Sequence, residues 1–470
     1  MSASVFVAMI LAFTAVMVAF AWFTKQKTNA SMFFAAGRNV GVMATALATT
    51  IGWMWADVMF STSQIGYDWG IYGLLWSAVP TLVSFPLFAV LAMQVRAQAP
   101  KVVTLPEFVA FKSAQSATAH GSMTAAVGLY QLVVLGLNAT VTGLLLQSVF
   151  GFDYVASSAS IVGLVLTYSL INGLKTSTYT GIAQCVVVFV LMACVCAVLV
   201  AGAGDAGMAW TATAFGPEGR IASMWGADLL INIGIPLAII LLTQPLVDQS
   251  IFQRLIALDK THGAMKPMIW TGVLSAVGVL MFGCLGFLGQ ALAQQGLIVV
   301  TDSQLVITQT IAHYWPEWGM ALFIVAFFAI VFSTVDAMYC SIAALVGYDV
   351  YKRWVNPQAT DAQMVNVGRL SMVGAALLAV LIALLQLKIL WFLFILGVIG
   401  GALVAPVAMA MLVKRLEGRY VAASIGLALL VGLPLSLYGN LNGLPVLVSA
   451  ASVGSIALGT LVCALGVRRR

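Results

Sequence analysis

The residues of this chain best suited to chemistry are carboxylates that lie inside long apolar segments. Asp57 and Asp336 fall well inside such segments, and Asp228 lies just inside another. A charge at the centre of a bilayer costs at least about 2.5 kcal/mol, so a carboxylate held there is by default a functional candidate facing a cavity. Two plainer interpretations stay open: Asp57 is protonated and bonded to a neighbouring helix, and Asp228 merely caps a helix start.

Two adjacent hydroxyls, Ser333 and Thr334, precede Asp336 in the sequence FSTVDAMYCS. Hard oxygen donors of this kind suit a small cation such as Na⁺. In a membrane helix, however, such hydroxyls commonly bond back to the carbonyl four residues earlier. The residues alone leave both interpretations open.

The stretch TTIGWMWADVMFSTSQIGYD, residues 49–68, carries more polar groups than a helix built only to cross lipid would need. Trp53 and Trp55 lie two positions apart, and helical positions at that spacing diverge by about 200°, so both indoles face one cavity only if the helix opens. One indole could form a flat wall over a small planar or cationic solute. Packing against lipid or protein is the alternative.

Composition indicates what positions these residues. The chain has 470 residues, of which 62% are hydrophobic and 8% charged, and its mean hydropathy is +1.05. A membrane span needs roughly 20 apolar residues, and such runs follow one another almost end to end. We therefore predict an all-α polytopic membrane protein with about thirteen spans, at 3–24, 40–65, 71–95, 120–149, 153–173, 178–202, 225–247, 266–292, 318–347, 364–386, 389–413, 419–438 and 443–466.

Lysine and arginine test this arrangement independently. With the N-terminus outside, the loops predicted to be cytoplasmic hold 19 of the 21 basic residues, and only Arg220 and Lys388 fall elsewhere. This is the asymmetry that the positive-inside rule requires. It predicts a cytoplasmic C-terminus and an integral protein of the cell (inner) membrane. The net charge of +6 is then a topology signal, and it gives no support to a nucleic-acid partner.

Two of the predicted spans look interrupted. The second contains Thr49–Gly52, and the seventh reads INIGIPLAIILLTQPLVDQ, with Gly234, Pro236 and Pro245. The two lie five spans apart, and each opens a run of five. Corresponding broken helices in two halves indicate an inverted-repeat secondary transporter with a site near the bilayer midplane. Opened backbone there frees carbonyls for a cation and helix ends for a substrate.

Several segments together resemble the sodium:solute symporter family, whose members have the LeuT-type fold. In family order they are GRNVGVMATALATT, TLPEFVAFK, NGLKTSTYTGIAQ, DQSIFQRLIALDK and FSTVDAMYCSIAALVGYDVYKRW, between residues 37 and 354. The resemblance implies a single transporter domain over residues 1–470. It would comprise an extra N-terminal helix at 3–24, inverted repeats at 40–202 and 225–413, and two extra C-terminal helices at 419–466.

The resemblance also implies a site for a coupling Na⁺. Its ligands would be the hydroxyls of Ser333 and Thr334 together with the carbonyls of Ile51, Met54 and Ile330, and Gly52 would allow the helix to break.

Within the family, the stretch around the two tryptophans is similar to the urea-transporter branch. Asp57 departs from that branch, where a small residue is expected, and an acid there could bind an amine-bearing or cationic solute or carry a proton. The predicted substrate-lining residues are Trp53, Asp57, Trp76, Ser77, Gln131 and Gln244.

We therefore expect Na⁺-coupled symport of a small polar organic solute into the cell by alternating access. Proton coupling through Asp57 is the alternative, and a transporter-like sensor is less favoured because the chain ends at VRRR directly after the last span. No phosphate-binding glycine loop, nucleophile triad or cysteine spacing for zinc is evident, so an enzyme is not expected. The expected partners are the solute, Na⁺ and the lipid bilayer, with no obligatory protein partner.

Overall fold

The computed structural model describes residues 3–24, 29–171, 173–205, 215, 223–259, 261–315 and 317–467. Throughout this described part the chain is helical, and its only β-type pairs are two isolated bridges. Of the basic residues used to predict topology, Lys25, Lys27, Arg220, Lys260 and Arg468–Arg470 lie outside the described residues.

The helices of the first half are α1 (Ala3–Phe23), α2 (Ala30–Ala35), α3 (Val42–Trp53), α4 (Ala56–Gln98), α5 (Leu105–Lys112), α6 (Ala117–Phe150), α7 (Tyr154–Ser169) and α8 (Leu174–Asp205). Those of the second half are α10 (Ala227–Leu229), α11 (Ile235–Val247), α12 (Gln249–Ala257), α13 (Met265–Gln294), α14 (Val306–Tyr314), α15 (Glu317–Ala344), α16 (Asp361–Ala383), α17 (Ile389–Leu412), α18 (Gly418–Leu441) and α19 (Pro445–Ala464). Leu230–Gly234 and Leu345–Val355 are π-helical.

The described residues hold eleven helices that are long and apolar enough to cross a membrane. Two shorter apolar helices, α3 and α7, fall in the predicted spans 40–65 and 153–173. The predicted spans 40–65 and 71–95 meet within α4, where the only non-helical residue is Gly70, at φ 63° and ψ −158°. The architecture is the predicted all-α bundle, but the count of thirteen spans is not confirmed.

Three segments predicted as loops contain helices instead. The segment 96–119 contains α5, and 293–317 contains α14. The segment 248–265 begins with α12, in which all nine residues are buried. The prediction was wrong for α12, since Arg254 was counted among the basic residues of a cytoplasmic loop beside Gln249 and Gln253. They lie instead inside the bundle.

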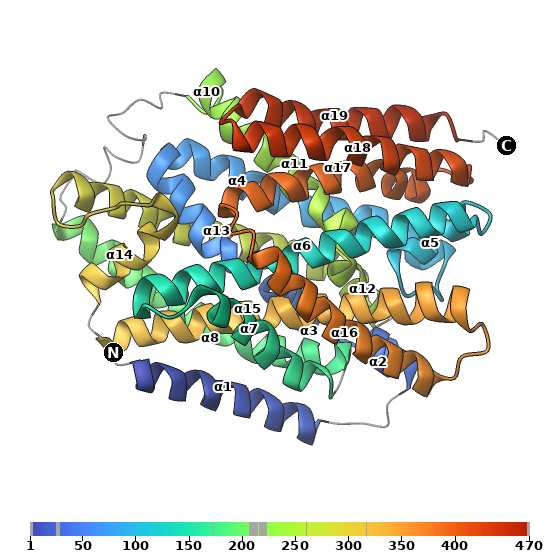
Figure 1. Ribbon diagram of the computed structural model, residues 1–470, viewed down its shortest axis with the longest axis horizontal. Coiled ribbons are helices and arrows are strands. Elements are labelled where there is room, and N and C mark those ends of the chain that lie inside the picture. Colours follow the sequence, from blue (N-terminus) through green and yellow to red (C-terminus); the bar gives the residue numbers. More distant parts are fainter. Residues whose placement is uncertain are drawn as a thin grey trace.

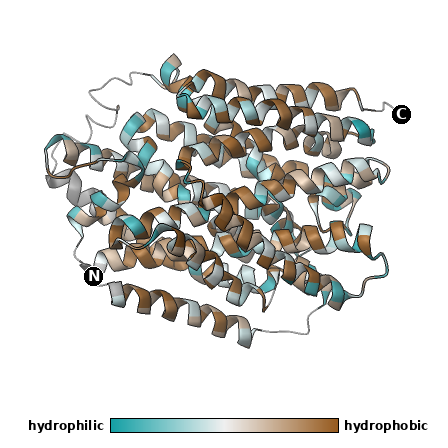
Figure 2. Ribbon diagram, viewed as in Figure 1, coloured by the Kyte–Doolittle hydropathy of each residue, from teal (hydrophilic) through white to brown (hydrophobic). Residues whose placement is uncertain are grey.

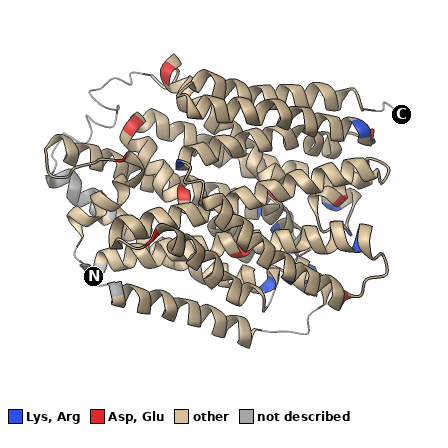
Figure 3. Ribbon diagram, viewed as in Figure 1, with Lys and Arg blue, Asp and Glu red and all other residues tan. Residues whose placement is uncertain are grey.

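Long helices run side by side through the bundle, with α1 at one edge and α18 and α19 at the other (Figure 1). The two ends of the chain lie at opposite ends of the bundle (Figure 1). Hydrophobic residues dominate the helices along their length (Figure 2). Most of the described basic residues gather toward the end of the bundle where the C-terminus lies, which we call the basic end (Figure 3). This matches the charge asymmetry of the sequence.

Glycines let α4 and α13 pack backbone against backbone. A Cβ on Gly66 would collide with the carbonyl oxygen of Gly283, and one on Gly286 would collide with that of Ser63. The Ser63 hydroxyl donates to the Phe282 carbonyl at 2.7 Å across the same interface. Small residues at close helix crossings are the usual means of packing in membranes. This contact fixes α4, and with it the start of α4 that forms the site.

We predict that Gly286→Val lowers the thermal unfolding temperature of the purified protein and its monodisperse yield in detergent. The added side chain meets backbone atoms that cannot rotate aside, and overpacking of this kind costs roughly 1–3 kcal/mol or more. Gly374→Val in α16 is the matched control, because a Cβ there meets nothing within 4 Å. Equal loss in both variants would contradict the packing argument.

Candidate functional site

The site is built around a break between α3 and α4. After Trp53, Met54 and Trp55 leave the helical conformation, with ψ angles of 81° and 163°. The Trp55 N–H donates to the Trp53 carbonyl at 2.8 Å, and the Val58 N–H donates to the Trp55 carbonyl at 3.0 Å. The Ala56 N–H donates to a side chain instead of a backbone carbonyl.

That side chain is Asn138 of α6, whose Oδ1 accepts from the Ala56 N–H at 3.1 Å. In an uninterrupted helix the N–H groups of residues 55, 56 and 58 would bond to the carbonyls of Ile51, Gly52 and Met54. Their diversion releases those three carbonyls. Asn138 was not among the predicted site residues, although an amide in the middle of an apolar helix was a signal that could have identified it.

The hydroxyl pair of α15 lies against this break. Thr334 Oγ1 donates to the Met54 carbonyl across 3.4 Å. Ser333 Oγ is buried and has no hydrogen-bond partner among the described residues. Neither hydroxyl forms a described bond to a carbonyl of its own helix, so the back-bonding interpretation does not describe this pair. A buried hydroxyl without a partner in a native fold calls for a ligand or water.

A small cavity of about 30 Å³ lies next to the break. Four of the predicted substrate residues line it: Trp53, Asp57, Ser77 and Gln244. The other lining residues are Trp55, Val58, Ser61, Thr62, Ile65, Leu237, Ile240, Leu241, Val279 and Leu393. A volume of this size holds about two water-sized groups, so only a solute of a few heavy atoms fits without rearrangement.

Four polar atoms at this cavity are buried without a hydrogen-bond partner among the described residues. They are the indole nitrogens of Trp53 and Trp55, the hydroxyl of Ser77, and Oδ1 of Asp57. The Ser61 hydroxyl lies within hydrogen-bonding reach of the Asp57 carboxylate. The residues that line the cavity therefore include N–H and O–H donors and a carboxyl oxygen without partners among the described residues.

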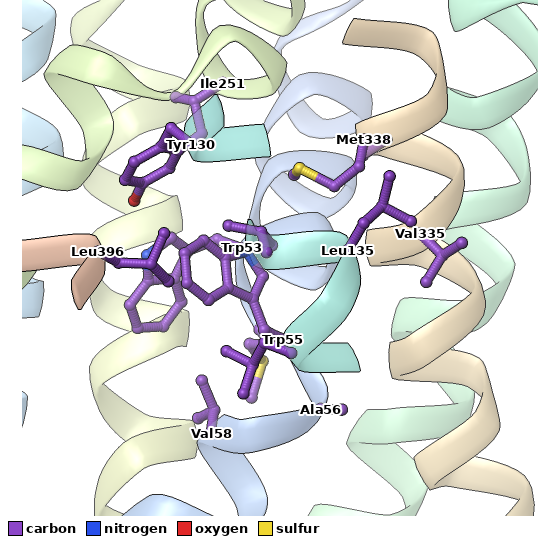
Figure 4. Packing of buried hydrophobic residues seen from close by; sticks show 14 of the residues in the cluster. Trp53, Trp55, Ala56, Val58, Tyr130, Leu135, Ile251, Val335, Met338 and Leu396 are labelled. Carbon is purple, nitrogen blue, oxygen red and sulfur yellow. The ribbon is translucent and has the colours of Figure 1, made fainter. Parts of the chain in front are cut away.

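Both tryptophans reach the cavity because the chain is not helical between them. Trp53 packs edge-on against Phe85 with ring centroids 5.7 Å apart, and Trp55 packs edge-on against Tyr130 at 6.4 Å. Figure 4 shows the two indoles together near Tyr130 and Leu396. The break thus removes the conflict that a continuous helix would impose on the pair.

Two predicted substrate residues lie outside the cavity lining. Trp76 donates its indole N–H to the Met224 carbonyl at 2.8 Å and packs edge-on against Trp225. Gln131 is buried between two helices, where its Nε2 donates to Asp248 Oδ1 at 3.2 Å and its Oε1 accepts from Ser341 at 3.2 Å. The structure gives both residues protein partners, unlike the four cavity atoms.

Arg254 of α12 is the largest polar side chain buried in the bundle, at 1% exposure. None of its three guanidinium nitrogens has a hydrogen-bond partner among the described residues. The guanidinium lies against Gly52, where a Cβ would collide with it. Gly52 is itself helical, so the expectation that it opens the helix was wrong: the break comes two residues later. The absent side chain leaves space for Arg254.

The buried acids near Arg254 supply its countercharge. Asp336 and Asp248 both attract the guanidinium electrostatically. Asp336 accepts from the Ser169 hydroxyl at 2.5 Å and is not among the cavity-lining residues. Asp248 caps α12 by accepting from the Ser250 N–H at 2.7 Å. Asp228, by contrast, lies in the exposed first turn of α10 and accepts from Asn232 at 2.8 Å.

These features define the class of protein. A helical membrane bundle with an opened helix beside a cavity that contains unpartnered polar groups is the architecture of secondary transporters. The chain matches the sequence model of the Sodium:solute symporter family over residues 33–425, and it belongs to that family. It is accordingly a membrane solute transporter and not an enzyme.

The sequence identity to individual relatives is low. The chain is 22% identical over 454 residues to the "Urea-proton symporter DUR3" of Oryza sativa subsp. japonica, an alignment that covers 87% of this chain and 62% of that relative's length. It is 24% identical over 390 residues to the "Osmoregulated proline transporter OpuE" of Bacillus subtilis, covering 78% of this chain and 75% of that one.

Among solved structures, the fold matches the substrate-bound outward-open state of a Na⁺-coupled sialic acid symporter. The TM-score is 0.81, the identity is 18%, and 99% of each chain is covered. This match supports the fold of the whole chain.

We predict that Arg254→Gln lowers the thermal unfolding temperature, since it removes the buried positive charge that attracts Asp248 and Asp336 and so leaves buried carboxylates without compensation. The double variant Arg254→Gln/Asp336→Asn should recover part of this loss, because it removes an uncompensated buried charge. Thermal unfolding of both variants in detergent measures the effect. A single variant as stable as the wild type, or a double variant that recovers nothing, would contradict the electrostatic account.

Proposed function

We propose that this protein is a Na⁺-coupled symporter that carries a small polar organic solute, urea- or amide-like or amine-bearing, into the cell by alternating access. The proposal rests on where the helix break, the hydroxyl pair of α15 and the cavity lie. The Met54 carbonyl at the break between α3 and α4 accepts from Thr334 of α15. Trp53 and Trp55, on either side of Met54, line a cavity in which four polar atoms lack partners among the described residues.

Na⁺ is the cotransported ion in this proposal. Its ligands are the hydroxyls of Ser333 and Thr334 and the carbonyls of Ile51, Met54 and Ile330. The released carbonyls and the unpartnered Ser333 hydroxyl support this set, and oxygen ligands suit a hard cation. Because the ligands come from both sides of the contact between the helix break and α15, the ion would hold those elements together.

The solute is proposed to bind between the indoles and Asp57. The donors at Trp53, Trp55 and Ser77 call for an acceptor such as a carbonyl, while the Asp57 carboxylate calls for N–H groups or a positive charge. Urea and simple amides carry both kinds of group within about four heavy atoms, so in this proposal the cavity of about 30 Å³ widens slightly to admit them. The name of the rice relative supports the same class.

In this proposal the membrane potential and the Na⁺ gradient drive release of Na⁺ and the solute into the cell. Each charge that crosses with the membrane potential gains about 2.3 kcal/mol per 100 mV, and low internal Na⁺ favours dissociation. In this proposal Arg254, buried against Gly52, closes the inner side while the ion and solute bind. Opening that side requires the guanidinium to leave, whereupon the released carbonyls become accessible from within. Rocking of a four-helix bundle, formed from the proposed inverted repeats at 40–202 and 225–413, would open the inner side.

We predict that proteoliposomes with an inward Na⁺ gradient take up at least one solute from a panel of urea, amides, amino acids, short carboxylates and amines. Thr334→Ala should raise the Na⁺ concentration for half-maximal uptake about tenfold or more, because a hydrogen-bonding group lost from a charged ligand costs about 1.5–3 kcal/mol. Uptake measured against Na⁺ concentration gives this shift directly.

Thr310→Ala is the matched control, since Thr310 is also buried and bonds only to the Val306 carbonyl of its own helix, at 2.9 Å. Its Na⁺ dependence should equal that of the wild type. Uptake that ignores Na⁺ and is unchanged by Thr334→Ala would refute the proposed ion site.

Proton coupling through Asp57 is the second candidate, favoured by its buried carboxylate with an unpartnered oxygen. It predicts uptake that is driven by an inward proton gradient without Na⁺ and is abolished in Asp57→Asn. Sodium coupling predicts instead that Asp57→Asn weakens the apparent solute affinity about tenfold or more and leaves the Na⁺ dependence in place. Asp68→Asn is the control, because that acid is bonded to Ser303 outside the cavity lining, at 3.1 Å.

A further inference from the structure

A second concave site lies at the basic end of the bundle. It is a pocket of about 370 Å³ whose lining includes two arginines and a histidine. The complete lining is Arg38, Met93, Arg96, Ala97, Pro100, Ile256, His262, Gly263 and Ala264. No acidic residue is among these described lining residues, so the pocket combines positive charge with a partly apolar wall.

The two guanidinium groups are held in place by backbone carbonyls. Arg38 donates to the carbonyls of Pro100, Lys101 and Val102. Arg96 donates to three carbonyls of the segment that joins α12 to α13, those of Leu258, Asp259 and His262, at 3.1 to 3.2 Å. A guanidinium has five N–H donors. Each arginine uses three of them in these bonds, so two N–H donors remain on each. Binding to either group would require little further ordering of the side chain.

Nearby acids are bonded elsewhere. The Asp259 carboxylate accepts from the backbone and hydroxyl of Thr261 at 2.7 and 2.6 Å, although it also lies 3.8 Å from His262 Nδ1. Glu107, which attracts Arg38 electrostatically, accepts from the Val103 N–H at 2.8 Å. Neither carboxylate lines the pocket. An external anion therefore has donors open to it.

An apolar stripe leads from the membrane into this pocket. Leu87, Val90 and Met93 lie three residues apart along α4 and are 45%, 48% and 42% exposed. On the tightly packed neighbour α13, Ile269 and Trp270 are 43% and 44% exposed. Large apolar side chains exposed on membrane-crossing helices face lipid. Because Met93 lines the pocket as well, the stripe and the basic site are continuous.

We propose that this pocket binds the headgroup of an anionic phospholipid, with the acyl chains lying along α4 and α13. Arg38, Arg96 and His262 face the phosphate, and basic residues at a membrane surface attract such lipids. The stripe favours a lipid over a soluble anion, since a free phosphate would use none of it. The pocket joins the segment before α3, the end of α4 and the start of α13, so a bound lipid braces the basic end of the helices that form the site.

The test is native mass spectrometry of the full-length protein after incubation with equal amounts of phosphatidylglycerol and phosphatidylcholine. The wild type should retain phosphatidylglycerol in preference. Ala97→Glu places a negative charge in the pocket without removing any arginine bond, and it should reduce that preference about tenfold. Ala97→Gln has almost the same size and should retain it.

Arg38→Gln/Arg96→Gln should lose the preference too, while Lys414→Gln, an exposed lysine outside the pocket, should not. Equal retention of both lipids by the wild type would overturn the proposal, as would an unchanged preference in Ala97→Glu. Displacement of the lipid by millimolar glycerol phosphate would show a site for soluble anions and would also overturn it.

Discussion

The structure depends on where three backbone N–H groups donate their hydrogen bonds. The N–H groups of residues 55, 56 and 58 all bond away from the carbonyls that an α-helix would give them, and the one from Ala56 is held by Asn138 of α6. An unpaired backbone group in an apolar interior costs several kcal/mol. The break therefore persists only because other groups satisfy it. The carbonyls it releases are the reason that oxygen donors exist at this place in the bundle.

A buried charge lies next to the helix break, and in the proposed function it closes the inner side. Arg254 lies within α12 against Gly52, without hydrogen bonds among the described residues and with Asp248 and Asp336 as its countercharges. Removing one of several buried charges that attract each other leaves the rest uncompensated, which is costly. Such an arrangement suits a contact that must form in one state and separate in another. The same residues that were predicted to lie in a cytoplasmic loop thus connect the helix break to the basic end of the bundle.

Much of this could be predicted from the sequence because the signals were local. Apolar runs of membrane length identified the bundle, and the polar stretch at residues 49–68 identified the opened helix. The structure brings Trp53, Asp57, Ser77 and Gln244 to one cavity, and their binding of a solute stays a prediction. The sequence could not show which side chains from distant segments contact one another in the folded chain. Gln131 and Trp76 carry polar groups just as those four residues do. They lie outside the cavity lining, where they bond to Asp248 and to the Met224 carbonyl.

The same limitation explains Asn138, Arg254 and the role of Gly52. A glycine before a helix break invites the interpretation that it causes the break, yet here it leaves space for a side chain 202 positions later in the chain. The short helix α12 fell outside the predicted spans, in a segment whose Arg254 was assigned to a cytoplasmic loop. Burial of a charged side chain depends on partners from distant segments, which periodicity does not reveal.

The central claim is that the opened helix and the hydroxyl pair of α15 together bind Na⁺. Equilibrium binding of radioactive sodium ion to the purified protein, in excess K⁺ and without solute, tests it most directly, with Ser333→Ala as the comparison. A sodium site of this kind predicts saturable binding in the wild type and a large loss of affinity in the variant, because the Ser333 hydroxyl is a buried oxygen at the site without a partner among the described residues. No saturable binding, or equal binding in the two proteins, would contradict it.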